Sequence, residues 1–152
     1  MQIRILAVGA KMPDWVVTAC AGYSKRLPRN WLKIIEIPTC QKFKSAAMAI
    51  AHEGEKLLAA INDRDNTIAL DIRGSCWSTE ELSQQLADWQ MQGKTVNLLI
   101  GGPNGLSDEC LARSQQHWSL SPLTLPHPLA RVVLVEQLYR AWSILQNHPY
   151  HK

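Results

Sequence analysis

Short apolar runs recur along the chain at intervals that suit β-strands. Strands are predicted at Ile3–Val8, Leu32–Ile37, Asn66–Ile72 and Thr95–Ile100, each bounded by turn-forming residues. The fourth run is predominantly apolar along its length, as expected of a strand that is buried on both faces. Ser119–Leu125 is expected to be a short fifth strand or an extended loop.

Between these runs, the apolar residues change to helical spacing. Pro13 precedes the first such segment, and Ser78 and Glu81 have the spacing of a capping box in a segment that stops at Gly93. Strands that alternate with helices predict an α/β fold with a mainly parallel sheet flanked by helices, in one domain over residues 1–152. The predicted helices are Asp14–Leu27, Lys44–Ile61, Ser78–Gly93, Ser107–Gln115 and Pro128–Gln146.

The last predicted helix is apolar over much of its circumference. It has two adjacent apolar stripes, so it must cover more than one partner surface. It could lie deep in the domain, or pack on the sheet with one stripe and on another subunit with the other. We expect the second arrangement, because a chain of 152 residues has little room for a wholly internal helix. The stripes consist of Leu134, Leu138, Ala141 and Leu145, and of Val132, Val135, Tyr139 and Trp142.

Charge is distributed unevenly along the sequence. The net charge is +3, yet residues 1–44 carry +6 and the remainder therefore −3. This asymmetry fits either one face for a polyanion or an ordinary solvated surface of mixed charge. The cations of the first 44 residues are Arg4, Lys11, Lys25, Arg26, Arg29, Lys33, Lys42 and Lys44, set against Asp14 and Glu36.

Several classes of protein do not suit this sequence. Apolar stretches such as "LARVVLVEQL" carry charges and are too short to span a membrane. The first residues lack a basic segment and a cleavage site typical of a signal peptide, so we expect a cytoplasmic protein. The four cysteines lack the spacing of a zinc site, so no metal centre is expected.

The fourth predicted strand runs into a glycine-rich segment, "IGGPNG". Ligands of open α/β sheets bind at the carboxyl ends of strands, and glycines let a ligand approach the backbone. The segment lacks the lysine of a P-loop, and the first two strands lack the ends of a dinucleotide-binding fold. On its own, the segment is equally well a tight turn that needs positive φ angles.

Four segments together indicate a family. "LLIGGPNGL", "WSLSPLTLPH", "RVVLVEQLYRAW" and the terminal "NHPYHK" resemble, in order and spacing, the RlmH family of SPOUT-class methyltransferases. The resemblance extends over the whole chain, including "VGAKMPDWV". Members of this family methylate N3 of a pseudouridine in 23S ribosomal RNA of the bacterial large subunit. The resemblance implies a SPOUT fold with a C-terminal trefoil knot, and a homodimer that acts on the large subunit or the assembled ribosome.

The resemblance also implies the cofactor, S-adenosylmethionine, and the residues around it. An uncharged adenine can be held by backbone groups and apolar walls, so no lysine is needed, and Gly102 would let the ligand come close. The cofactor-binding positions carried over from the family are Leu70, Gly102, Ser121, Pro122, Leu123, Thr124, Leu125 and Pro126.

Methyl transfer to N3 requires loss of the imide proton, for which a histidine is the natural acceptor near neutral pH. Arg131 could stabilise the resulting anion. In the family, the C-terminal tail completes the cofactor site of the neighbouring subunit. A non-catalytic RNA-binding or ribosome-associated dimer of the same fold is the alternative. The candidate catalytic residues are His127, His148, Tyr150, His151 and Lys152.

Overall fold

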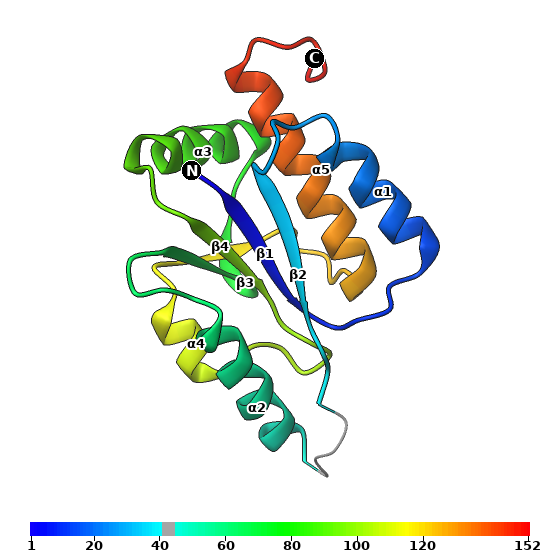
Figure 1. Cartoon of the computed structure of the whole chain (residues 1–152), viewed down its shortest axis with the longest axis vertical. Coiled ribbons are helices and arrows are strands. Elements are labelled where there is room, and N and C mark those ends of the chain that lie inside the picture. Colours follow the sequence, from blue (N-terminus) through cyan, green and yellow to red (C-terminus); the bar gives the residue numbers. More distant parts are fainter. Residues whose placement is uncertain (41–44) are drawn as a thin grey trace.

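A five-stranded sheet forms the centre of the described molecule (Figure 1). The computed structural model describes residues 1–40 and 45–152. Within them the strand order is β2-β1-β4-β3-β5, and every pair of neighbours is parallel. The predicted α/β fold with a parallel sheet is therefore confirmed. The strands are β1 (Ile3–Val8), β2 (Leu32–Ile37), β3 (Asn66–Cys76), β4 (Val96–Ile100) and β5 (Gln116–Ser119).

Helices cover both faces of the sheet because successive strand residues point to opposite sides. In β1, Ile3 and Ile5 pack with α1, α3 and α5, whereas Leu6 and Val8 pack with α2 and α4. Figure 1 shows α5 between α1 and α3. None of the helices in the described part of the chain has the length and apolar character of a membrane span. The helices are α1 (Asp14–Ser24), α2 (Ala46–Ala59), α3 (Thr79–Gln92), α4 (Asp108–Arg113) and α5 (His127–Leu145).

The helix ends follow the sequence signals. The Ser78 hydroxyl accepts from the Glu81 N–H at 3.0 Å, and the Glu81 carboxylate accepts from the Ser78 N–H at 2.7 Å, which completes the capping box of α3. Gly93 ends that helix with a φ of 67°. The predicted start of the second helix at Lys44 lies outside the described residues, as do Lys42 and Lys44 of the charge excess.

The fifth strand was misplaced by the sequence pattern. Residues 116–119 pair with β3, and only Ser119 belongs to the range predicted as a strand or loop. Because β5 has a neighbour on one side only, polar Gln116 and His117 are tolerated in it. The expected apolar alternation begins after the strand, in a segment that turns away from the sheet.

The second apolar stripe of α5 is covered mainly within the chain. Val135 and Tyr139 are buried, and the rings of Tyr139 and Tyr23 of α1 are 6.0 Å apart. Leu134 and Leu138 of the first stripe are buried as well, so the expectation that one stripe is left for another subunit is wrong for the central residues of both. Two flanking helices, α1 and α3, account for the width of the apolar surface. Strand order does not test the trefoil knot, which stays a prediction.

Candidate active site

A pocket of about 510 Å³ opens where β4 ends and α5 begins, beside the point of β3 where its pairing with β4 stops. This is the carboxyl edge of the sheet, the usual place for a ligand in a parallel α/β fold. Its volume is in the range of small-molecule sites. The lining residues come from three segments: Leu70, Asp71 and Ile72; Ile100, Gly101, Gly102, Pro103 and Gly105; and Trp118, Ser119, Leu120, Ser121, Leu123, Thr124, Leu125, Pro126, His127 and Ala130.

The glycine loop, Gly101–Gly105, is shaped by close backbone contacts. A Cβ on Gly101 would lie 2.6 Å from the carbonyl carbon and oxygen of Gly105, so no other residue fits there. Gly105 has a φ of 88°, and its N–H donates to the Gly102 carbonyl at 3.0 Å. The loop is therefore a tight turn and one wall of the pocket, so the two interpretations of the glycines are compatible.

Gly102 is also constrained by packing within the protein. A Cβ there would meet the Val8 side chain at 3.1 Å and the Glu53 carboxylate at 3.3 Å, both of them protein atoms. Gly102 does line the pocket, but its small size is explained by packing against β1 and α2. Close approach of a ligand to Gly102 stays a prediction beside this packing reason.

The segment from residue 120 to 126 forms the opposite wall. The Ser121 hydroxyl accepts from the Leu123 N–H at 2.9 Å, and the Ser121 carbonyl accepts from the Ser119 hydroxyl at 3.0 Å. These bonds fix the turn at the start of the segment. Leu123 is 74% exposed at the rim. Of the predicted cofactor-binding residues, only Pro122 does not line the cavity.

His127 and Arg131 connect the pocket to the strands behind it. The Nε and Nη2 groups of Arg131 lie 3.4 Å from Nε2 of His127, and Nη2 donates to the Gly9 carbonyl at 2.7 Å. Nη1 lies 3.7 Å from the Glu36 carboxylate. Because a guanidinium can only donate, Nε2 of His127 accepts, and the neutral ring carries its proton on Nδ1.

The electrostatic surroundings of His127 favour its neutral form. Burial lowers the pKa of His127, the Arg131 charge lowers it further, and a hydrogen bond with the Gly101 backbone partly opposes the shift. A neutral ring whose Nε2 faces an arginine is poorly placed to receive a proton. Its contacts suit it to holding the glycine loop against α5.

Asp71 brings a negative charge to the pocket that the sequence pattern did not reveal. Hydrogen bonds from the Arg73 side chain and backbone hold the pKa of the Asp71 carboxyl below its ordinary value. The Asp71 side chain is 13% exposed, whereas that of Arg73 is 75% exposed. Asp71 directly follows Leu70 at the end of a predicted strand, a position that could have indicated it.

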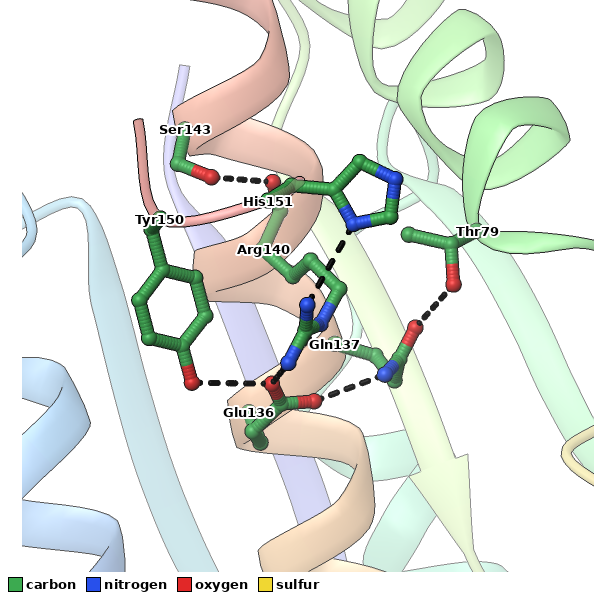
Figure 2. Close-up of polar contacts among 7 residues, drawn as sticks. All are labelled: Thr79, Glu136, Gln137, Arg140, Ser143, Tyr150 and His151. Carbon is green, nitrogen blue, oxygen red and sulfur yellow. Dashed lines mark hydrogen bonds and ion pairs between the residues drawn. The ribbon is translucent and has the colours of Figure 1, made fainter. Parts of the chain in front are cut away.

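The C-terminal tail folds back on the outer side of α5 (Figure 2). The Tyr150 hydroxyl donates to the Glu136 carboxylate at 3.0 Å, and its ring packs against Tyr139 with centroids 4.7 Å apart. Arg140 contacts both the ring of Tyr150 and Nδ1 of His151. Burial, together with hydrogen bonds involving Tyr23 and Glu136, raises the pKa of Tyr150, so its hydroxyl stays protonated.

The remaining tail residues lie in the same region. Nδ1 of His148 accepts from the Tyr150 N–H at 3.2 Å, Nε2 of His151 lies 3.1 Å from the Glu80 carboxylate, and Lys152 is exposed. Glu136, to which Tyr150 binds, is nine residues from His127 on α5, or roughly 14 Å along the helix axis. The tail and His127 therefore do not meet within the chain.

Comparisons with known proteins agree with this architecture. The family model described as "Predicted SPOUT methyltransferase" matches residues 1–151. Proteins named ribosomal RNA large subunit methyltransferase H are 56% identical in Saccharophagus degradans and 48% identical in Pseudomonas aeruginosa strain UCBPP-PA14, over the full length of both chains in each case.

Solved structures with low sequence identity share the fold. A methylase family protein of Haemophilus influenzae is 15% identical, with a TM-score of 0.60 over 99% of this chain and 70% of its own. A methyltransferase of Legionella pneumophila, solved with the bound cofactor SAM, is 14% identical, with a TM-score of 0.53 over 93% of this chain and 66% of its own.

Proposed function

The chain belongs to the SPOUT methyltransferase family, and from that premise we propose that it methylates N3 of a pseudouridine in 23S ribosomal RNA. The substrate would be the large subunit or the assembled ribosome in the cytoplasm, and the methyl donor is S-adenosylmethionine. The observation that carries the proposal is the open pocket between the glycine loop and residues 118–127. Relatives named large-subunit methyltransferases, 56% and 54% identical over the whole chain, support ribosomal RNA of the large subunit as the substrate.

The residues of the pocket fit an adenosine-bearing cation. Leu70, Ile100 and Leu125 supply apolar surface, and residues 100–102 and 123–126 also line the pocket, where their backbone groups would be the hydrogen-bonding partners of an adenine. The ionised Asp71 adds a negative charge. S-adenosylmethionine carries a positive sulfonium and an uncharged adenine, so these walls complement both parts.

The cofactor, when bound, supplies an electrophilic methyl group. The chain must hold the acceptor nitrogen in line with that group and provide for loss of the N3 proton. His127 keeps the glycine loop in place, as its contacts with Arg131 and Gly101 indicate. The tail then offers two imidazoles, His148 and His151, as candidates for taking the proton, and the Lys152 cation as a candidate for stabilising the imide anion.

A composite site in a homodimer would bring the tail to a pocket. Within one protomer, Tyr150 binds midway along α5, away from the start of that helix. Exposed apolar side chains lie near the carboxyl edge of the sheet, where a second subunit could cover them. These are Trp15 and Val17 of α1, Leu123 at the pocket rim and Leu129 of α5.

Calorimetry and mass spectrometry test the enzyme assignment. Purified protein should bind S-adenosylmethionine. Large subunits or ribosomes from cells lacking the gene should gain one methyl group on a pseudouridine when the protein and S-adenosylmethionine are added. Absence of cofactor binding by folded protein would instead support the non-catalytic RNA-binding alternative. Cofactor binding with methylation of a different nucleoside would refute the proposed target.

Mixed dimers test the composite site. Gly101→Ala should disable the pocket, and deletion of Tyr150–Lys152 should remove the tail, so each variant alone should be inactive. When the two variants are refolded together in equal amounts, half of the dimers would contain one subunit of each kind. Such a mixed dimer has one intact pocket, in the truncated subunit, and one intact tail, in the Gly101→Ala subunit. If the tail acts on the neighbouring subunit, the mixture should regain about a quarter of wild-type activity. No recovery would place the tail in its own subunit's site.

A further inference from the structure

Four exposed cations gather where α1 passes into β2. They are Lys25, Arg26, Arg29 and Lys33, and no acidic residue occurs between Gly22 and Glu36. We call this group the basic corner. Across residues 1–40 and 45–152, no carboxylate forms an ion pair with any of the four. Their charge is therefore directed to solvent or to a partner.

The backbone of the basic corner is firmly anchored. Leu27 and Trp31 are buried between the cations, and the Trp31 carbonyl accepts from the Ile3 N–H at 2.8 Å. The Gln2 side chain donates to the Asn30 carbonyl at 3.0 Å, and Asn30 itself has a φ of 61°. A rigid loop loses little conformational entropy when its cations bind a ligand.

The basic corner is continuous with the aromatic side chains that hold the tail. The Arg26 guanidinium lies 5.6 Å from the ring centroids of both Tyr23 and Tyr139. Tyr139 in turn contacts Tyr150 at 4.7 Å and His148 at 6.5 Å. Tyr139 is buried and anchors this cluster, whereas Tyr23 and Tyr150 are half-buried and His148 is exposed. Cations next to such accessible rings suit RNA, because RNA combines phosphates with unstacked bases.

The basic corner is separate from the methyl-donor pocket. It lies at the amino edge of the sheet, since Leu32 of β2 pairs with Ile3 of β1, whereas the pocket lies at the carboxyl edge. The six residues of β1 span roughly 20 Å between these edges. A contact with RNA at the corner can therefore change substrate affinity without changing the cofactor site.

On these grounds, and resting on the proposed function, we infer that the basic corner holds the phosphate backbone of folded ribosomal RNA beside the C-terminal tail. The tail and the corner would then approach the RNA as one surface. In the proposed composite dimer, this surface would adjoin the pocket of the other subunit. Phosphate contacts of this kind fix register and orientation and leave the choice of base to the pocket.

A triple charge reversal tests the inference against a matched control. The test variant is Lys25→Glu, Arg29→Glu and Lys33→Glu, which spares Arg26 and its ring contacts. The control is Lys56→Glu, Arg64→Glu and Lys94→Glu, three exposed cations elsewhere on the chain with the same change in net charge. Filter binding to 23S RNA and to large subunits, methylation of large subunits and calorimetry with S-adenosylhomocysteine are measured for both.

The test variant should bind 23S RNA at least about tenfold more weakly than the control, with a shallower salt dependence, and both should bind S-adenosylhomocysteine like wild type. KM for large subunits should rise in parallel. Equal RNA binding by the two variants would overturn the inference. Loss of binding to large subunits, with normal binding to naked RNA, would also overturn it and indicate a ribosomal protein.

The RNA-binding comparison is independent of catalysis. If wild type binds 23S RNA but methylates no ribosomal RNA, the proposed function fails while the comparison of variants still decides the role of the corner. If wild type is active and the test variant matches the control in binding and KM, the proposed function stands and the inference fails.

Discussion

Arg131 and His127 lie one turn apart on α5, with the arginine Nε 3.4 Å from Nε2 of the imidazole. The same arginine donates to the Gly9 carbonyl at 2.7 Å, so one buried side chain ties the end of β1 to the wall of the pocket. His127 contacts the Gly101 backbone on its other side. The pocket is thus supported by a chain of hydrogen bonds from strand to helix to glycine loop.

Replacing Arg131 with methionine should loosen this support. The Gly9 carbonyl would lose its donor, at a cost of about 1–3 kcal/mol in the free energy of unfolding. The pKa of His127 should rise, because the cation that lowers it is gone. Urea unfolding and NMR titration of the imidazole measure the two effects. Arg64→Met, at an exposed position, is the control and should change neither quantity.

The stability of the protein should depend on pH through His127. Its folded-state pKa is lowered, so the unfolded chain binds the proton more tightly and gains it first as the pH falls. The contribution of the neutral His127 to the free energy of unfolding is complete above the unfolded-state pKa of about 6.5, and it is lost as the pH falls through the folded-state pKa. Urea unfolding at pH 7.5 and 5.5 should show that the free energy of unfolding falls less between these pH values for His127→Gln than for wild type. Equal losses would contradict the assignment.

Gly101 should be the least replaceable glycine of the loop. Even alanine would place its Cβ 2.6 Å from the backbone of Gly105, so Gly101→Ala should distort the turn and weaken binding of S-adenosylhomocysteine by at least about tenfold. Gly22→Ala is the matched control. A Cβ at Gly22 meets nothing within 4 Å, and that change in α1 should raise stability by about 0.5–1 kcal/mol. Calorimetry and urea unfolding measure both variants.

Much of the fold could be predicted because local and tertiary signals agree. The capping box at Ser78 is sufficient to predict the start of α3. The apolar run of β4 is sufficient to predict that strand, since burial on both faces demands apolar residues there. β5 was misplaced because an edge strand needs no apolar alternation. One of the two stripes of α5 was expected to face another subunit, because the sequence does not reveal that α1 and α3 both flank α5.

The candidate site was predictable only in part. The resemblance supplied Leu70, Gly102 and residues 121–126, and the structure brings all but Pro122 to one pocket. It supplied no steric reason for Gly101, whose constraint comes from a turn closed by Gly105. Nor could spacing along the chain locate the tail, because Tyr150 and Glu136 meet only when the chain reverses after α5. Their roles in binding and catalysis stay predictions.

Replacing Asp71 tests whether a negative charge in the pocket contributes to binding of the positively charged cofactor. Its carboxylate is ionised and mostly shielded from solvent, so it should attract the positive sulfonium of S-adenosylmethionine more than the neutral sulfur of S-adenosylhomocysteine. Asp71→Asn should weaken binding of the first ligand by about threefold to fivefold, a modest effect because the paired Arg73 guanidinium offsets part of the charge, and of the second very little. Calorimetry with both ligands measures the difference.

Salt and a control variant separate charge from shape in this test. The difference between the two ligands should shrink as ionic strength rises, since screening acts on the sulfonium interaction alone. Asp63→Asn, at an exposed position that is not among the residues lining the pocket, should leave both affinities unchanged. An equal loss for both ligands in Asp71→Asn would mean that the carboxylate, through its bonds to Arg73, maintains the shape of the wall and does not recognise the cation.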